Sequence, residues 1–300
     1  MDSKLIDLLR CPACKGTDLV ISGKKRVALV CRECKHRTRV LDDIPRFVAA
    51  GDQGFNERWQ RHAKPQANDG RNQAIFEDKT GWHPWDMDGK TFLVGGCGAG
   101  RFPRLAVDNG ATIIGVDGTA TGLEGTAKLV PEALLLQADL LDLSMLRDGC
   151  VDAAWSIGVL HHTADPEKAF NEIARCIKPG GSFAVWVYVQ HTTDPALLAP
   201  LEMFHAITRC CPPGKLYEAI EKYAPGVRDT YNKAWGPLQQ ILRVSIEENN
   251  EDCISDTFDW HTPQYRSWHT EAEVRGWFEA AGFSVDRVGD FPVTMRGVKN

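Results

Sequence analysis

Residues 91–189 alternate between short apolar runs and amphipathic stretches, and this alternation limits the fold more than any other feature of the sequence. The apolar runs predict strands at 91–95, 112–117, 133–139, 151–158 and 181–189. Helices are predicted between them at 100–110, 122–130 and 166–177, the last with Pro166 in its first turn. Strands that alternate with helices form a parallel sheet covered on both faces. The sequence therefore predicts a Rossmann-like α/β fold that binds its ligand at the carboxyl ends of the strands.

The first strand leads into a glycine-rich turn within the stretch FLVGGCGAGRF. Gly96, Gly98 and Gly100 form a GxGxG pattern, which Arg101 follows. A Walker phosphate loop needs Gly-Lys-Ser/Thr after its glycines, and a dinucleotide fingerprint needs a glycine where Arg101 stands. The turn is therefore expected to let the backbone approach a flat ligand that needs no phosphate clamp.

Acidic residues stand at the ends of the next two strands. Asp117 ends the second strand and is placed to accept both hydroxyls of a ribose, whereas Asp139 ends the third and can accept an adenine amine. A glycine turn, a ribose contact and an adenine contact at successive strand ends together predict S-adenosylmethionine as the cofactor. The neighbouring Gly118, Leu140 and Ile157 complete the expected cofactor site.

The first 48 residues predict a small zinc domain. Cys11 and Cys14 form one CxxC pair, and Cys31 and Cys34 form a second. Two such turns supply four thiolates to a tetrahedral zinc ion and leave no position open for substrate, so the metal is expected to be structural. The intervening segment reads as strand, Gly-Lys turn and strand, as in a zinc ribbon. Reduced core cysteines and a redox CxxC are the alternatives, but the βαβ pattern of a redox motif is missing.

Both parts of the chain resemble known families. "LLRCPACKGTDLV", "LVCRECK" and "VLDDIPRFV", within residues 4–48, resemble the small zinc-ribbon proteins that activate tRNA and release-factor methyltransferases. Residues 90–190 and 268–300 resemble class I S-adenosylmethionine-dependent methyltransferases, most specifically in "GVLHHTADPEKAFNEIARCIKPGG". The second resemblance implies a seven-stranded sheet with an antiparallel last hairpin. It also implies an acid where Val94 stands, so backbone carbonyls or the connector are expected to hold the methionine ammonium of the cofactor.

These assignments divide the chain into successive parts. They are a zinc ribbon (1–48), a connector (49–88), the cofactor-binding core (89–190), an insertion (191–269) and a C-terminal helix with two strands (270–300). In the insertion, helical apolar spacing recurs at 195–211 and 235–250. Such helices are expected to cover the cofactor crevice as a lid over a small acceptor. A homodimer interface is the alternative use for them.

Candidate catalytic residues follow the fourth strand and recur in the insertion. Methyl transfer from an activated sulfonium depends mainly on positioning, and a general base helps where the acceptor is a hydroxyl or an amine. His161 and His162 are candidate bases, although both can equally pack within their turn. His261 and Tyr265 are candidate acceptor-pocket residues, whereas Trp268 is expected to pack.

The charge is unevenly distributed. Residues 1–48 carry 11 Lys/Arg against 6 Asp/Glu, a net +5, and the other residues carry 24 against 34, a net −10. The acidic body and the insertion favour a small-molecule methyltransferase of a biosynthetic or tailoring pathway. The basic ribbon keeps an RNA base methyltransferase as an alternative, and a methyltransferase-like non-enzymatic scaffold is a third. No membrane span or secretion signal is recognised, and 10 cysteines read as thiols favour the cytoplasm.

Overall fold

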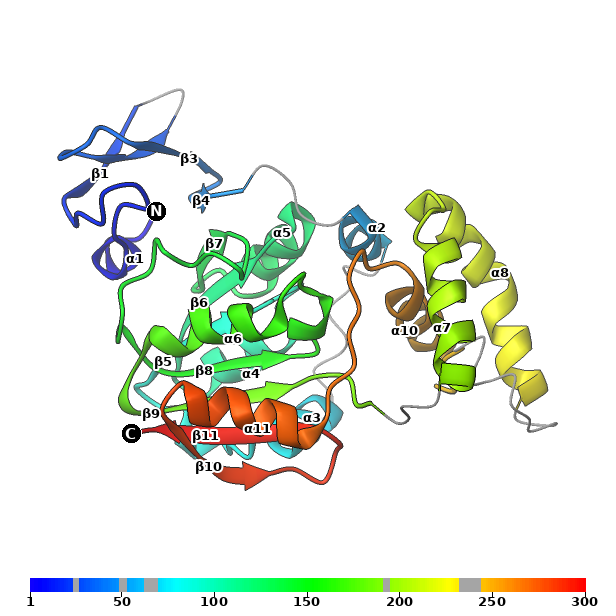
Figure 1. The fold of residues 1–300 in the computed structure, drawn as a ribbon. Coiled ribbons are helices and arrows are strands. Elements are labelled where there is room, and N and C mark those ends of the chain that lie inside the picture. Colours follow the sequence, from blue (N-terminus) through cyan, green and yellow to red (C-terminus); the bar gives the residue numbers. More distant parts are fainter. Residues whose placement is uncertain (24–26, 49–52, 62–69, 191–194, 232–243) are drawn as a thin grey trace.

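The computed structural model describes residues 1–23, 27–48, 53–61, 70–190, 195–231 and 244–300 (Figure 1). Their strands form one 11-stranded sheet in the order β1-β2-β3-β4-β7-β6-β5-β8-β9-β11-β10. The strands are β1 (Leu19–Ser22), β2 (Ala28–Cys31), β3 (Arg37–Leu41), β4 (Ile44–Arg46), β5 (Thr91–Gly95), β6 (Thr112–Asp117), β7 (Leu134–Gln137), β8 (Val151–Ile157), β9 (Ile177–Trp186), β10 (Phe283–Val288) and β11 (Thr294–Lys299).

Strands β5 to β11 make up the predicted methyltransferase sheet. β7, β6, β5, β8 and β9 are parallel, and β11 lies antiparallel between β9 and β10. The Rossmann-like fold and its antiparallel last hairpin are therefore confirmed. The chain leaves β5 toward β6 on one side, while β8 pairs on the other, so the topological switch point lies at the carboxyl end of β5.

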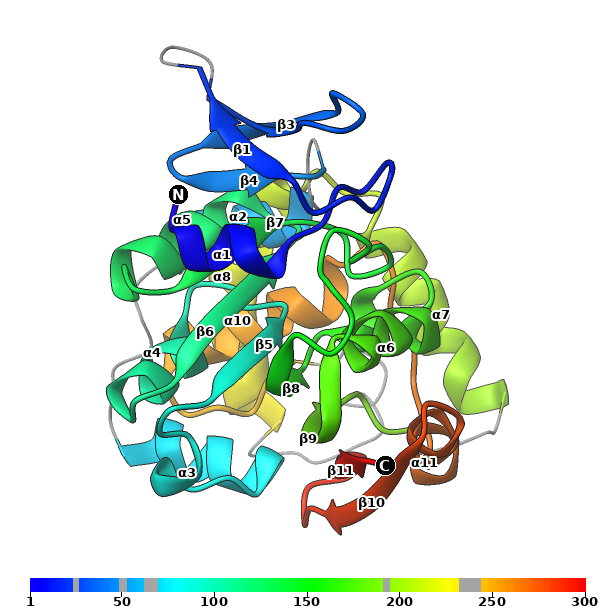
Figure 2. The ribbon, with the colours of Figure 1, turned by 90° about the vertical axis from the view of Figure 1, so that its left-hand side faces the viewer.

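Helices cover both faces of this sheet (Figure 2). Phe92 and Val94 of β5 belong to the apolar cluster of α3 (Gly70–Thr80), α4 (Arg101–Asp108) and α5 (Ala120–Leu129). Leu93 belongs to the opposite cluster, with α6 (Pro166–Arg175) and α11 (Glu271–Ala280). Successive strand residues point to opposite faces, so the continuous apolar runs reflect burial on both sides. Single turns of 3-10 helix occur at η1 (Pro84–Asp86) and η2 (Leu160–His162).

The predicted helix starts are found. Pro166 is the first residue of α6, behind the N-cap Asp165, whose carboxylate accepts from the Lys168 amide. The Thr270 hydroxyl accepts from the Glu273 amide at 3.2 Å and caps α11.

The ribbon, expected as a separate domain, is continuous with the sheet (Figure 2). After α1 (Ser3–Leu8), strands β1 to β4 form an antiparallel meander, and β4 pairs with β7 in parallel. The Phe47 amide donates to the Gln137 carbonyl at 2.8 Å, and Arg46 Nη1 donates to Gln137 Oε1 at 3.1 Å. No local pattern announces a pairing between residues so far apart in the chain. This junction between the ribbon and the sheet was therefore not predicted.

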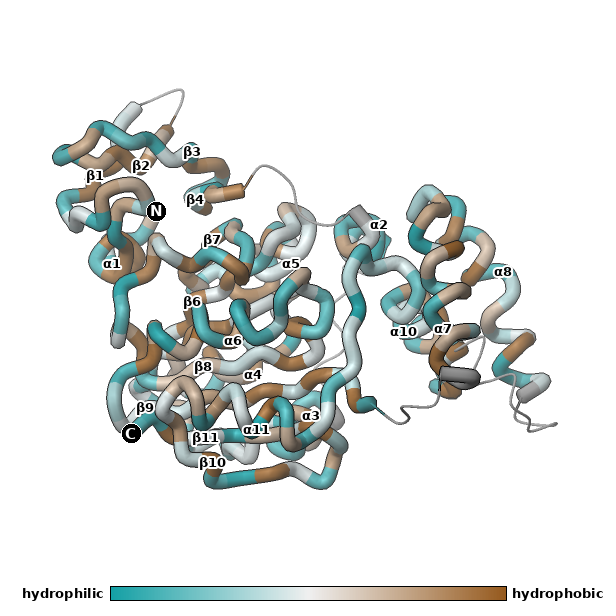
Figure 3. The backbone as a smooth tube through the Cα atoms, in the orientation of Figure 1, coloured by the Kyte–Doolittle hydropathy of each residue, from teal (hydrophilic) through white to brown (hydrophobic). Residues whose placement is uncertain are grey.

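The insertion places α7 (Pro195–Thr208), α8 (Pro213–Tyr231) and α10 (Asn250–His261) beside the core, with α2 (Gln53–Arg61) of the connector between them (Figure 1). Along α7 most residues are hydrophobic, whereas α8 mixes hydrophobic and hydrophilic residues (Figure 3). Tyr217 of α8 packs with Ile254 and Phe258 of α10 in a small separate core. The helix expected at 235–250 falls largely outside the described residues, and its described end, 244–249, is not helical. Helix α10 was not predicted.

Across the part of the chain that the structure describes, no helix combines the length and hydropathy that a membrane crossing requires.

Candidate functional site

The glycine turn after β5 has a backbone that only glycine adopts readily. Gly96 and Gly98 have φ values of 77° and 51°. A Cβ on Gly96 would lie 2.4 Å from the Val159 side chain, and one on Gly98 would lie 2.6 Å from the Trp59 indole. Gly100, with φ 90°, is the N-cap of α4 and packs toward α5. The first two glycines therefore permit close approach to the turn, while the third starts a helix.

Asp117 at the end of β6 stabilises this turn directly. Its Oδ2 accepts from the Gly98 amide at 2.8 Å, and its Oδ1 accepts from the amide and hydroxyl of Thr119 at 2.8 and 2.7 Å. The side chain is buried, and burial raises the pKa of the carboxyl, although these hydrogen bonds oppose the rise. Each carboxylate oxygen has two lone pairs. Oδ2, with one donor so far, retains capacity for a ligand hydroxyl.

A cavity of about 2020 Å³ opens at the carboxyl ends of β5, β6, β7 and β8. Seven of the eight residues predicted to bind the cofactor line it: Gly96, Gly98, Asp117, Gly118, Asp139, Leu140 and Ile157. Gly100 is not among the lining residues. Asp139 is exposed and accepts from the Leu141 amide at 2.9 Å, whereas Leu140 is buried. These seven residues, which the sequence places at the ends of four strands, therefore line one cavity.

The two histidines of η2 differ in position. His161 is fully buried and stacks on Tyr188 with 3.7 Å between ring centroids, and it does not line the cavity. Its Nδ1 accepts from the Tyr188 amide at 3.2 Å. His162 does line the cavity, and its Nδ1 donates to the Tyr265 carbonyl at 3.2 Å. The free lone pair of His162 therefore lies on Nε2, and burial lowers its pKa to about 3, so the ring is neutral.

The two predicted acceptor-pocket residues also differ in whether they line the cavity. Tyr265 is 44% exposed and lines the cavity. His261 is buried in α10 with its ring edge-on to Phe204, and it is not a lining residue. Trp268 stacks on Tyr188 with 5.4 Å between centroids and also lines the cavity. It therefore packs as expected while presenting part of its surface to the cavity.

Helix α2 of the connector covers the glycine turn, which the sequence analysis did not foresee. The Trp59 indole lies against Gly98 and Gly122, and the Phe55 ring meets His162 edge-on at 5.3 Å. Arg58 reaches α10 of the insertion, where its Nη1 pairs with Asp259 Oδ2 at 2.6 Å. The aromatic spacing in "GFNERWQRH" was visible in the sequence, but only folding shows that it faces the cofactor turn.

Four acids of α10 line the cavity and were not predicted from the sequence, namely Glu251, Asp252, Asp256 and Asp259. Asp256 and Asp259 lie one turn apart on α10. Burial raises the pKa of Asp256 to about 6 and that of Asp259 to about 7, although the positive charge of Arg58 lowers both. A carboxyl pKa this high marks a negative charge that its surroundings only partly compensate. The i, i+3 spacing in "SDTFDW" was the available signal.

The raised pKa of Asp256 predicts how stability depends on pH. The pKa of Asp256 is about 6 in the folded protein and about 3.9 in the unfolded chain. The protonated carboxyl therefore stabilises the fold fully below about pH 4, and this stabilisation is lost as the pH rises through about 6. Asp256→Asn cannot ionise. We therefore expect the variant to be about 1–3 kcal/mol more stable than wild type at pH 8 and unchanged at pH 4. Urea unfolding at both pH values measures this, and an equal difference at both would contradict it.

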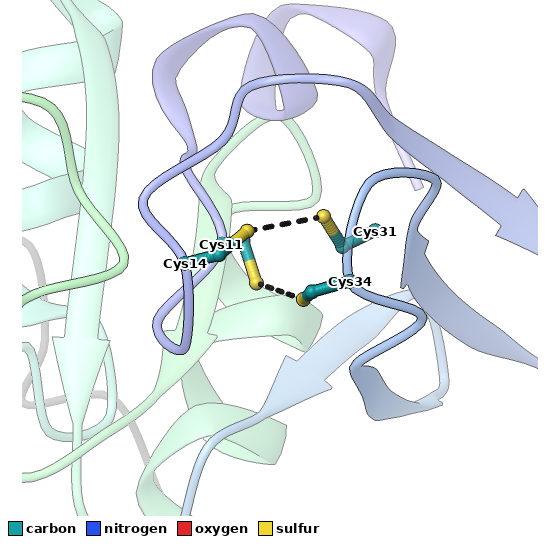
Figure 4. Close-up of side chains that lie close together, drawn as sticks. All are labelled: Cys11, Cys14, Cys31 and Cys34. Carbon is teal, nitrogen blue, oxygen red and sulfur yellow. Dashed lines mark hydrogen bonds between the residues drawn. The ribbon is translucent and has the colours of Figure 1, made fainter.

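The four cysteines of the ribbon converge on one point (Figure 4). Their sulfurs all lie within 4.8 Å of one another, with 3.5 Å between Cys11 and Cys34 and 3.6 Å between Cys14 and Cys31. A tetrahedral zinc ion with Zn–S bonds of about 2.3 Å needs sulfurs about 3.8 Å apart. Both CxxC turns close on a left-handed lysine four residues after the first cysteine. The thiol set and its spacing therefore fit a closed structural zinc site.

Comparison with known families agrees with both halves of this description. A model of the Methyltransferase domain matches residues 93–185, and a model of the Trm112p-like proteins matches residues 2–40. A UPF0434 protein of Dechloromonas aromatica is 44% identical over 45 residues, which are 15% of this chain and 74% of that protein.

The methyltransferase relatives match over shorter shares of their length. A Mycolicibacterium smegmatis protein, named as a probable S-adenosylmethionine-dependent methyltransferase, is 30% identical over 142 residues, 47% of this chain and 54% of that protein. The chain thus spans about half the length of this relative. A solved complex of the Haloferax volcanii Trm112 methyltransferase activator with a methyltransferase is 18% identical and has a TM-score of 0.47, with 83% of this chain and 99% of that chain covered. The chain therefore carries a Methyltransferase domain over residues 93–185 and an N-terminal Trm112p-like ribbon over residues 2–40, and its sheet and its cysteine cluster agree with these two matches.

Proposed function

We propose that the protein transfers a methyl group from S-adenosylmethionine to a small-molecule acceptor held under the lid. The observation that carries this proposal is the single cavity that the cofactor turn shares with α10. Glycine turn, strand-end acids and lid residues all line it. A covered cavity suits an acceptor that is shielded from water during transfer.

The residues at the strand ends fit the cofactor. Gly96 and Gly98 line the cavity with a backbone that glycine adopts readily, and Asp117 Oδ2 can accept a ribose hydroxyl. Leu140 and Ile157 offer apolar surface for an adenine, next to the Asp139 carboxylate. When bound, S-adenosylmethionine supplies a methyl group activated by its sulfonium sulfur. The protein then has mainly to bind and orient the two reactants.

His162 is the proposed contact for the acceptor. With Nδ1 donating to Tyr265, its Nε2 can accept a hydrogen bond from an acceptor hydroxyl or amine. Its low pKa makes it a weak base, so its proposed role is orientation. Tyr265 and Trp268 supply aromatic surface on the same cavity. His161 and His261, which do not line the cavity, are proposed to support His162 and the lid through packing.

An RNA base is the second candidate acceptor. A relative from Arabidopsis thaliana, named tRNA (carboxymethyluridine(34)-5-O)-methyltransferase, is 33% identical over 113 residues, 37% of this chain and 27% of that protein. The basic ribbon favours this reading, and the acids on the lid disfavour it because phosphates would be repelled. Salt-sensitive binding of a tRNA mixture would favour RNA. The homodimer, the cytoplasmic location and the five-part domain boundaries stay predictions.

Calorimetric titration with S-adenosylmethionine and S-adenosylhomocysteine tests the cofactor site. Wild type is expected to bind both, and Asp117→Ala is expected to weaken binding by about 10-fold to 100-fold, because a charge-assisted hydrogen bond and the turn it holds are both lost. Asp286→Ala, which removes the partner of Arg296 outside the cavity, is the matched control and should bind normally. Failure of wild type to bind either ligand would sink the proposal and favour a non-enzymatic scaffold.

A further inference from the structure

The side of the cavity formed by α10 carries more negative charge than nearby positive side chains neutralise. Asp256 and Asp259 project from one side of α10, and both line the cavity. Arg58 of α2 pairs with Asp259 and donates from Nε to the Ser255 hydroxyl at 3.3 Å, and its positive charge also acts on Asp256. Glu247 and Asp252 add further negative charge around Asp256. Two carboxylates therefore share one guanidinium.

The hydrogen bonding of the pair is also incomplete. Asp259 Oδ2 is held by Arg58, but Asp259 Oδ1 is buried and has no hydrogen-bond partner among the described residues. Both members of the Arg58–Asp259 pair are only 16% exposed. Within the described ranges, the donor to Asp256 is the Ser245 hydroxyl, at a long distance of 3.5 Å. A carboxylate that is withdrawn from water without full compensation is costly, and a cation entering the adjacent cavity would remove that cost.

We infer that Asp256 and Asp259 form a binding site for a primary ammonium group, an inference that rests on the proposed function of the cavity. An ammonium brings one positive charge and three donors; its charge offsets the one excess negative charge, and Asp256, with its long hydrogen bond of 3.5 Å from Ser245, offers it acceptor oxygens. Trp260, Tyr188 and Trp268 line the same cavity and add aromatic surface that favours a cation. Two ligands of this cavity can supply the group: the methionine end of the cofactor, or the acceptor itself as a small-molecule amine.

Two matched ligand pairs distinguish these sources at about pH 8, where both carboxyl groups are ionised. S-adenosylhomocysteine carries the methionine-end ammonium, and 5′-methylthioadenosine lacks the whole amino-acid end, both its ammonium and its carboxylate, so the comparison of wild type with Asp259→Asn isolates the ammonium. Tyramine carries an ammonium on an aromatic body, and 4-ethylphenol is the same molecule without it. Binding of each is measured by calorimetry or ligand-observed NMR to wild type and Asp259→Asn. Asp286→Asn is the control, because Asp286 also pairs with an arginine but lies outside the cavity.

If the cofactor supplies the ammonium, Asp259→Asn should weaken S-adenosylhomocysteine binding about tenfold or more and leave 5′-methylthioadenosine unchanged. If the acceptor supplies it, wild type should prefer tyramine to 4-ethylphenol about tenfold or more, and Asp259→Asn should lose that preference. In the variant we expect the amide oxygen to turn to Arg58 and the amide N–H groups to face the ligand, which repels a donor. Asp286→Asn should behave as wild type in both arms.

The inference is overturned if neither ammonium-bearing ligand is preferred by wild type, or if the preferences survive in Asp259→Asn. Asp256→Asn, which is expected to fold more stably above neutral pH, provides a second variant should Asp259→Asn not fold. Absence of S-adenosylhomocysteine binding to wild type together with a clear tyramine preference would defeat the proposed function and leave the ammonium site standing. The two failures are thus distinguishable.

Discussion

Removing zinc is expected to unfold residues 1–48 and to expose the β7 edge of the sheet. The ribbon buries few apolar side chains of its own, among them Leu19, Leu29 and Val40. A domain of this size gains most of its stability from the metal, for which structural sites contribute about 10–16 kcal/mol of apparent binding free energy. Chelation at neutral pH should therefore produce a loss of β-sheet circular dichroism before any heating.

Cysteine variants separate the metal effect from a general thiol effect. Cys11→Ser removes one ligand and should lower the zinc content and reproduce the chelated state. Cys211→Ser changes an exposed thiol of the insertion, outside the cluster, and should retain zinc and wild-type stability. If Cys11→Ser retains one zinc ion per chain and unfolds as wild type does, the site is not the structural centre described above.

Unfolding of the ribbon should also loosen the glycine turn, because the Gln137 side chain links the two. Gln137 Oε1 accepts from Arg46 of the ribbon, and its Nε2 donates to the Gly118 carbonyl at 2.9 Å. Gly118 directly follows Asp117, which holds the Gly98 amide. Hydrogen exchange in the zinc-depleted protein should therefore become faster at the amides of β7 and of the glycine turn. The amides of α8 and α10, which share a separate small core, should be unaffected.

Gly96→Ala is expected to be the most damaging single-methyl addition in the cofactor site. At φ 77° an alanine costs about 1 kcal/mol or slightly more, and its Cβ would stand 2.4 Å from the branched Val159 side chain, which adds about 1–3 kcal/mol of overpacking. The turn must move to relieve the contact. We expect a loss of about 2–4 kcal/mol in the free energy of unfolding and at least about tenfold weaker S-adenosylhomocysteine binding.

Gly180→Ala is the control for the backbone term. Gly180 has the same φ of 77°, but a Cβ there would meet no heavy atom within 4 Å. This variant should lose about 1 kcal/mol and bind S-adenosylhomocysteine normally. Denaturant unfolding and calorimetry of both variants give the comparison. Equal losses of stability and affinity in the two would show that close approach at Gly96 has no special importance.

The sequence alone predicted the features whose signals are local. Strand and helix alternation gave the sheet and its helices, because each element buries its own periodic apolar face. The two CxxC pairs predicted the cysteine cluster. Each short turn already brings two thiols together, so the four-thiol cluster forms once the two turns meet. The strand-end acids and glycines were assigned to one site, since the carboxyl ends of parallel strands meet at one edge.

Only the tertiary structure decided which distant residues meet. The pairing of Arg46 with Gln137, the packing of Trp59 on Gly98, and the approach of Arg58 to Asp259 each join segments that no periodicity links. The same holds for His161 and His162, which are adjacent in sequence but differ in access to the cavity. Local free energies determine where strands, helices and turns form. The contacts between these elements depend on how whole faces pack. In this protein they place α10, with Asp256 and Asp259, along the cavity.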